Sequence, residues 1–390
     1  MPDFDQIIPL RNSFSGKFDR MAAAKGVADP DAIPMWVADM DFRPPQSVLD
    51  ALQTDLDRGV FGYSGDDAPV RAAICRWMQK MHGWTIEPDW IRFSNGVVNG
   101  LKMALQAYTQ PGDGVILFSP VYHAFYSALR SFGRVPVESQ MRLDADNRYQ
   151  MDLDTLATQL TGIEKMVILC SPHNPAGRLW SAEEIGALAD FCLAHDLLLI
   201  SDEIHMDLAF PGQRHLCTAV AAPQAAQNLI TLTAASKGFN LAGGETGFVI
   251  IGDPALREKF TPGFNALRTT PNRFGMQMLQ AAFDGGHEWS AEVRAYIADN
   301  FAIWKERIDA LPGITVMDMP STYLSWVDFS GTGMSDDETL RRIHEAGVVP
   351  DEGDQFGSGS EGFHRFNLAL PRPRLMEAIA RMEAAFGDLQ

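Results

Sequence analysis

One lysine stands where its side-chain amine could act as a nucleophile. Lys237 comes shortly after the apolar run 228–232, lies among small residues and has no Asp or Glu within five positions. A lysine in a crowded, poorly solvated site has a lowered pKa, and its neutral amine can form a Schiff base with an aldehyde. Most lysines are exposed, so this hypothesis requires a ligand site around Lys237.

Two other segments place groups suited to a flat, phosphorylated ligand after apolar runs, where open α/β sheets bind their ligands. In the first, an Asn-Gly pair leads into a helix, and the free N–H groups of Gly96, Val97 and Val98 at its start favour a phosphate. In the second, Tyr122 follows an apolar run and could stack on a planar ring. Taken singly, the first segment can also be an ordinary turn, and Tyr122 can be a packing residue.

Two further segments supply an amide and an acid. Asn174 lies between two prolines that fix its loop, so its side chain is held at the end of the run 165–170. Asp202 directly follows a buried-strand pattern, and an ionised carboxylate there needs a cationic partner or several hydrogen bonds. A turn-forming Asn and a helix-capping Asp are simpler explanations, but capping leaves the stretch Asp202-Glu-Ile-His205 unexplained.

Together these five segments fit one ligand, a phosphorylated aromatic aldehyde whose ring nitrogen requires an anion. The phosphate would bind at Gly96–Val98, and the ring would stack on Tyr122. Asn174 would contact the ring hydroxyl, Asp202 would pair with the pyridinium, and Lys237 would form the Schiff base. This combination predicts a site for pyridoxal 5'-phosphate (PLP).

The elements that must hold these residues follow from the hydrophobic pattern. Apolar runs of four to six residues without period-two alternation are typical of strands buried on both faces. A capping box, Ser181-Ala-Glu-Glu, marks the start of one of the helices between them. We therefore predict an α/β domain with a largely parallel sheet, whose strands lie near 114–118, 165–170, 197–202, 228–232 and 246–251.

The two ends of the chain have a different pattern. An amphipathic stretch over about 288–311 predicts one long helix that could connect two domains. The expected domains are a large one over 46–286 and a smaller α+β one built from 1–45 and 287–390. The elements expected after the long helix are strands at 314–317 and 322–329, a helix near 336–346, a Gly-rich loop at 353–359 and a last strand and helix.

Charge and cysteine content exclude several classes of function. The 390 residues contain 32 Lys and Arg against 50 Asp and Glu, a net charge of −18, which argues against nucleic acid or an anionic membrane as partner. The four cysteines form no CxxC pair, so we expect no metal site. The acidic N-terminus and the shortness of every apolar stretch predict a cytoplasmic protein.

Three motifs resemble those of the fold-type-I PLP enzymes, the aspartate aminotransferase superfamily. They are Asn174-Pro-Ala-Gly, Ser201-Asp-Glu-Ile-His and Ser236-Lys-Gly-Phe-Asn, with 28 residues from Asn174 to Asp202 and 35 from Asp202 to Lys237. Within that superfamily the chain looks most like the MalY/PatB group of cystathionine β-lyases, or C–S β-lyases. This likeness rests on Ile33-Pro-Met-Trp-Val-Ala-Asp-Met-Asp-Phe, on Phe61-Gly-Tyr and on the stretch 287–300.

The resemblance implies the PLP-transferase fold of type I, with a mostly parallel sheet of the seven-stranded type between helices and a smaller α+β domain. It also implies a homodimer with active sites at the subunit interface. Lys237 and Tyr122 would be the catalytic residues, and Lys237 would move the Cα proton. Arg365, Ala38 and Asn174 would bind the substrate. The implied cofactor-binding residues are Gly96, Val97, Val98, Tyr122, Asn174, Asp202, His205, Ser236 and Lys237, together with Tyr63 of the neighbouring subunit.

The activity implied is α,β-elimination of L-cystathionine or an S-substituted cysteine to a thiol, pyruvate and ammonia. An aminotransferase is the main alternative, because it needs the same lysine, aspartate and arginine. A PLP-binding regulator that acts by contact with another protein is a second alternative. The sequence also departs from the group's usual pattern at Gly238, at Gly243-Gly-Glu-Thr and at His123-Ala, all close to the expected cofactor pocket.

Overall fold

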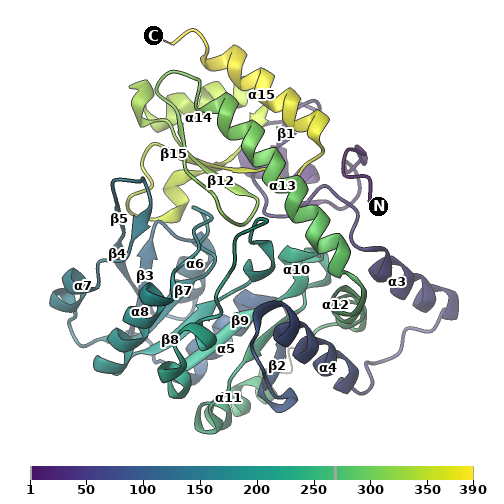
Figure 1. The fold of residues 1–390 in the computed structure, drawn as a ribbon, viewed down its shortest axis with the longest axis vertical. Coiled ribbons are helices and arrows are strands. Elements are labelled where there is room, and N and C mark those ends of the chain that lie inside the picture. The colour runs from purple at the N-terminus through teal and green to yellow at the C-terminus, as the bar shows by residue number, and fades with distance from the viewer. Residues whose placement is uncertain (1, 268–269, 390) are drawn as a thin grey trace.

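The computed structural model describes residues 2–267 and 270–389, which form a large and a smaller unit (Figure 1). The large unit contains a seven-stranded sheet in the order β2-β10-β9-β8-β7-β3-β4. All neighbouring pairs from β9 to β4 are parallel, and β10 runs antiparallel to both of its neighbours. The strands are β2 (Ile91–Ser94), β3 (Gly114–Ser119), β4 (Val135–Gln140), β7 (Glu164–Cys170), β8 (Leu198–Asp202), β9 (Leu229–Thr233) and β10 (Gly247–Ile250).

Helices cover both faces of this sheet because alternate strand residues point to opposite sides. On β3, Val115 and Leu117 pack with α5 (Val97–Tyr108), α6 (His123–Ser131) and α11 (Pro254–Leu267). Ile116 of the same strand packs on the other side with α8 (Ala182–Ala194). The predicted α/β domain with a mostly parallel sheet between helices is therefore confirmed.

The predicted capping box is also present. The Ser181 side chain accepts a hydrogen bond from the Glu184 N–H at 3.2 Å, and the Glu184 carboxylate accepts one from the Ser181 N–H at 2.9 Å. Two otherwise unpaired N–H groups at the start of α8 are thus satisfied. The remaining elements of the large unit are α3 (Gln46–Arg58), α4 (Ala68–Trp77), β5 (Arg142–Leu143), β6 (Tyr149–Gln150), α7 (Leu153–Gln159), α9 (Thr218–Ala221), α10 (Ala235–Gly238) and α12 (Arg273–Gly285).

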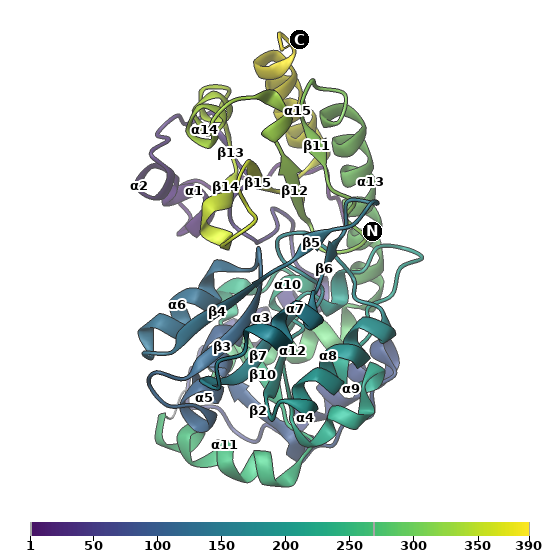
Figure 2. The same ribbon diagram turned by 90° about the vertical axis from the view of Figure 1, so that its left-hand side faces the viewer.

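The smaller unit lies at one end of the large one and contains an antiparallel sheet in the order β11-β12-β15-β14 (Figure 2). Near it, β1 (Ile33–Pro34) of the N-terminal segment pairs in parallel with β13 (Val348–Val349). This pairing ties the N-terminal segment to β13. Its other elements are α1 (Gly16–Asp19), α2 (Met21–Lys25), β11 (Thr315–Val316), β12 (Leu324–Asp328), α14 (Asp336–Glu345), β14 (Asp351–Glu352), β15 (Phe363–Asn367) and α15 (Arg372–Phe386).

The long helix predicted over 288–311 is α13 (His287–Ile308), which runs along both units (Figure 1). The strand predicted at 322–329 begins only at Leu324, because Thr322 has a left-handed backbone with φ of 71°. The predicted loop at 353–359 contains a short 3-10 helix, Gly353–Phe356. None of the described helices has both the length and the apolar character that crossing a bilayer requires.

Residues 36–42 cross from the smaller unit to the large one. On one side, the Asp41 N–H donates to the Ala369 carbonyl at 2.9 Å. On the other, the Asn240 side chain donates to the carbonyls of Met40 at 2.9 Å and Phe42 at 2.7 Å. The crossing segment, as we call residues 36–42, is therefore fixed to both units and passes over the carboxyl ends of the sheet strands.

Candidate active site

A cavity of about 470 Å³ lies between the crossing segment and the carboxyl ends of β7 and β8. Ligands of open α/β sheets bind at this edge. Arg365 and Tyr63 do not line the cavity, but the other ten predicted site residues do. These ten are Ala38, Gly96, Val97, Val98, Tyr122, Asn174, Asp202, His205, Ser236 and Lys237.

Lys237 lies in the short helix α10, directly after β9, and points toward the crossing segment. Its Nζ donates a hydrogen bond to the Ala38 carbonyl at 2.6 Å. Burial, reinforced by the charges of Arg365 and Lys17, lowers the pKa of Lys237 to about 8, although Asp39 and Asp202 oppose this effect. The amine is therefore much easier to deprotonate than an ordinary lysine, as a Schiff-base lysine must be.

This lowered pKa predicts an unusual reactivity of the cofactor-free protein. Only the neutral amine is a nucleophile, so acetylation of Lys237 by a brief pulse of acetic anhydride should rise with pH through a midpoint near 8. The measurement is peptide mass spectrometry over about pH 6 to 11, with the exposed Lys165 in the same digest as reference. A midpoint for Lys237 at or above about 10 would contradict the environment described above.

Asp202 is the last residue of β8, and its buried carboxyl group lines the cavity. Its Oδ1 accepts a hydrogen bond from the Ile204 N–H at 3.1 Å. Burial raises the pKa of Asp202 to about 7, and the neighbouring Glu203 adds to the effect, whereas Lys237 opposes it. No cation among the described residues forms an ion pair with Asp202, so a cationic group on a ligand would be its natural partner.

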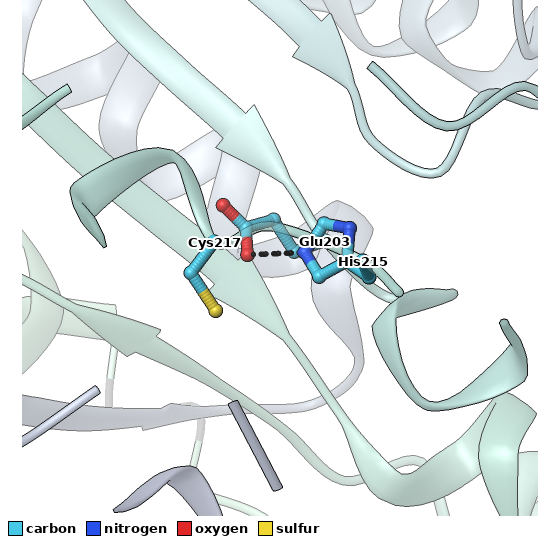
Figure 3. Close-up of side chains that lie close together, drawn as sticks. All are labelled: Glu203, His215 and Cys217. Carbon is cyan, nitrogen blue, oxygen red and sulfur yellow. Dashed lines mark hydrogen bonds and ion pairs between the residues drawn. The ribbon is translucent and has the colours of Figure 1, made fainter. Parts of the chain in front are cut away.

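Glu203, the second acid of this motif, is not among the residues that line the cavity and belongs to a buried group with His215 and Cys217 (Figure 3). Its carboxylate accepts hydrogen bonds from His215 Nε2 at 2.9 Å, Ser201 Oγ at 3.0 Å and the Thr218 N–H at 2.9 Å. The ligating atoms of Glu203, His215 and Cys217 lie within 4.8 Å of one another, a spacing that a metal ion could use. Because the carboxylate already has three donors, we interpret the group as hydrogen-bonded support for the end of β8.

Arg365 lies on β15 of the smaller unit and is buried behind Asn174. Its Nη1 donates to Asn174 Oδ1 at 2.8 Å, and its Nη2 donates to Asp351 Oδ2 at 2.6 Å and to the Trp36 carbonyl at 3.0 Å. The other oxygen of Asp351 binds Lys25 Nζ at 2.8 Å. Arg365 is thus positioned at the site through Asn174, and its Nε is a buried donor without a partner among the described residues.

The start of α5 forms the phosphate end of the cavity. Gly96 has a φ of 78°, a conformation that favours glycine, and Val97 and Val98 are the first residues of the helix. The backbone here packs tightly on β10: a Cβ atom on Gly247 would lie 2.9 Å from the Gly96 carbonyl carbon and 3.0 Å from the Val97 nitrogen. Ser236 lines the same cavity, so a hydroxyl group and backbone N–H groups are available to an anion.

Tyr122 and His205 complete the walls. Tyr122 precedes α6, and burial raises the pKa of its hydroxyl group. His205 is buried, and the loss of solvation lowers the pKa of its ring well below the usual value. Its Nδ1 has no partner in the described part of the chain. A neutral histidine with a free ring nitrogen can contact a polar group of a ligand.

Tyr63 lies elsewhere, on the loop between α3 and α4, where its side chain is fully exposed. Glu245 and Thr246, from the stretch Gly243-Gly-Glu-Thr that was expected close to the cofactor pocket, line the cavity. Sequence reasoning missed Lys102. Lys102 lies four positions after Val98 on α5, so helical periodicity could have predicted it.

The cavity fits the predicted cofactor. Within the described part of the chain no cation pairs with the buried Asp202, which suits a pyridinium nitrogen, and no group bonds Nδ1 of His205 at the same cavity. Lys237 has the lowered pKa that a Schiff base needs, and the start of α5 can hold a phosphate. A seven-stranded sheet with these groups at its carboxyl edge defines the fold-type-I class of PLP-dependent enzymes.

Comparisons with known proteins agree with this class. The chain belongs to the aminotransferase class I and II family, whose model matches residues 30–382. Cystathionine beta-lyase PatB of Bacillus subtilis is 38% identical over 388 residues, which cover 98% of this chain and 99% of the relative. Cystalysin of Treponema denticola, solved with PLP, is 34% identical with a TM-score of 0.95 over 100% of both chains. A PLP-bound C–S lyase from Staphylococcus hominis is 30% identical, with a TM-score of 0.91 over 98% of each chain.

Proposed function

We propose that this protein is a PLP-dependent C–S β-lyase that acts on L-cystathionine or another S-substituted cysteine. The products would be a thiol, pyruvate and ammonia. The observation that carries the proposal is Lys237, whose pKa is lowered to about 8, in one cavity with Asp202. The full-length similarity to a cystathionine β-lyase and to two solved proteins of related activity or cofactor content supports the choice of reaction.

Each residue has a distinct task in this reaction. When bound, PLP would supply an electron sink at the substrate Cα. Asp202, as a carboxylate, would hold the ring nitrogen in its protonated form, and Tyr122 would pack against the ring. Lys237 would hold the cofactor and, as a free amine, would take the proton from the substrate Cα. Arg365 and Asn174 hold the substrate carboxylate, and the crossing segment at Ala38 excludes water from the site.

An aminotransferase is the alternative that the family and the site also allow. It needs the same Lys237 and Asp202, and differs in where the proton is returned and in keeping the Cβ substituent. The purified protein should be incubated with L-cystathionine, and pyruvate and free thiol should be measured with and without a 2-oxo acid. Pyruvate and thiol in equal amounts without the 2-oxo acid support the lyase. Amino transfer to the 2-oxo acid without release of thiol would reject it.

We also propose that the active protein is a cytoplasmic homodimer, with domains divided at about residues 46 and 286. Four exposed apolar or aromatic side chains follow closely in the sequence at the end of α3 and in the loop after it, at Leu56, Val60, Phe61 and Tyr63. A second copy of the chain would cover them, because exposed aromatic patches are typical of interfaces. Tyr63 would then contact the phosphate of the cofactor in the neighbouring subunit.

A mixed dimer tests this arrangement. Lys237→Ala and Tyr63→Ala chains should each form impaired dimers, but co-expression should restore activity. In a mixed dimer one site combines the intact Lys237 of one chain with the intact Tyr63 of the other, so about half of the sites in the purified mixed dimer should be active. Activity should be measured on mixed dimers purified with two different affinity tags. If Tyr63 serves its own chain's site, the mixed dimer will be no more active than the Tyr63→Ala dimer.

A further inference from the structure

Three consecutive backbone carbonyl groups of the crossing segment accept hydrogen bonds from side chains. The Asn367 side chain donates to the carbonyls of Val37, at 2.6 Å, and of Asp39. Between them, the Ala38 carbonyl accepts two hydrogen bonds, from Lys237 Nζ at 2.6 Å and from the Tyr323 hydroxyl at 3.0 Å. The Tyr323 hydroxyl and the Lys237 amine therefore donate to the same acceptor.

Tyr323 is held firmly in this position. Its side chain is completely buried, and its ring lies edge-on to His205 with the centroids 6.2 Å apart. The preceding residue, Thr322, has a φ of 71°, which is unfavourable for a β-branched side chain. Strain of this kind persists only where surrounding contacts compensate for it, and it is concentrated at functional sites. The left-handed backbone at Thr322 therefore turns the chain immediately before Tyr323.

We propose that Tyr323 is a positioning residue for Lys237, and that the two act through the Ala38 carbonyl. The Tyr323 hydroxyl occupies one lone pair of this carbonyl and leaves the other as the docking point of the Lys237 amine whenever that amine is free. Two hydrogen-bond donors on one carbonyl also limit how strongly it can stabilise the protonated amine. The inference deepens the proposed function, since it concerns the same lysine.

The geometry has two consequences for proton transfer. A docked amine has one N–H direction fixed, so its lone pair is presented to the substrate Cα in a narrow range of orientations. Weaker stabilisation of the ammonium form keeps more of the amine neutral at neutral pH. The other charged groups that act on Lys237 remain unchanged when Tyr323 is altered, and they are Asp39, Arg365, Asp202 and Lys17.

The test compares Tyr323→Phe with the unchanged protein. Phenylalanine keeps the ring and its packing, so the variant loses only the donor. In the cofactor-free variant, the midpoint of Lys237 acetylation should rise by about half a pH unit or more. In the loaded enzyme, kcat should fall about tenfold while KM changes by less than about threefold, and the acid limb of the pH profile of kcat should shift to higher pH.

Tyr149→Phe is the matched control. Tyr149 is also buried, and its hydroxyl accepts a hydrogen bond from Trp326 Nε1 at 3.2 Å, outside the cavity. Its loss should change stability without moving the Lys237 midpoint. The proposal fails if the two variants give the same Lys237 midpoint and the same kcat. The acetylation readout needs neither cofactor nor substrate, so this failure can be distinguished from a wrong assignment of the reaction.

Discussion

Replacing Lys237 with alanine should lower the kcat for pyruvate formation by about a thousandfold or more. In the proposed function, the substitution would remove both the covalent attachment of the cofactor and the base that takes the Cα proton. Among the other described lysines, Lys102 also lines the cavity but lies on α5, and Lys17 is paired with Asp39 at 2.8 Å and Asp41 at 2.7 Å.

Two measurements distinguish the loss of cofactor attachment from the loss of the base. Borohydride reduction followed by mass spectrometry should add the mass of the cofactor to the peptide that contains Lys237 in the unchanged protein, and to no peptide in Lys237→Ala. Steady-state assays should show the fall in kcat. Lys165→Ala is the control, because Lys165 is exposed and bonds only the nearby Gly162 carbonyl. Turnover within about tenfold of the unchanged enzyme would show that Lys237 is not the base.

Local sequence patterns predicted the strands and the residues at their ends because both depend on near neighbours in the chain. A strand buried on both faces needs an unbroken apolar run, and the residue after it must lie at the sheet edge. Asp202, Asn174 and Lys237 were found for this reason. The sequence could not predict that Asp202 lines the cavity while Glu203 bonds His215, because this depends on where the distant His215 packs.

Some contacts at the site escaped sequence reasoning because they join residues that are separate in the chain. Asp351 and Tyr323 belong to the smaller unit and show no motif, yet Asp351 binds Arg365 and Tyr323 binds the Ala38 carbonyl of the crossing segment. The left-handed backbone at Thr322 gives no signal either, since threonine disfavours it and tertiary contacts impose it. The pairing of β14 with β15 and the packing of distant segments determine such contacts, and a single sequence does not report them.

The acidic composition also has a structural explanation at the site. The net charge of −18 leaves little general attraction for an anionic cofactor or a carboxylate substrate. In the proposed function, binding of these anions would depend on a few local donors, which are the start of α5, Ser236, Lys237 and Arg365. Each of them should matter more than in a basic protein, because no diffuse positive field replaces a lost contact.

Replacing Arg365 is the second substitution with a large expected effect. Arg365→Lys should reduce kcat/KM by about 10- to 150-fold, the equivalent of about 1.5–3 kcal/mol for lost hydrogen bonds to a charged group. Lysine keeps a positive charge beside Asp351 but lacks the planar fork that bonds both Asn174 and Asp351 and that, in the proposed function, would also serve a substrate carboxylate. The loss should appear mainly in KM, because the carboxylate is bound in both ground and transition states.

Arg365→Ala separates the binding role from the structural one. It leaves Asp351 buried with Lys25 alone, so it should also lower the free energy of unfolding by about 3 kcal/mol, near the lower end expected for a broken buried pair. Arg365→Lys should stay close to the unchanged protein in urea denaturation, and so should Arg341→Ala, whose ion pairs with Glu338 and Glu345 are exposed. A kcat/KM for Arg365→Lys within about twofold of the unchanged enzyme would mean that Arg365 only supports the fold. Because Arg365 reaches the cavity through Asn174, a loss confined to KM would place that pair directly on the substrate carboxylate.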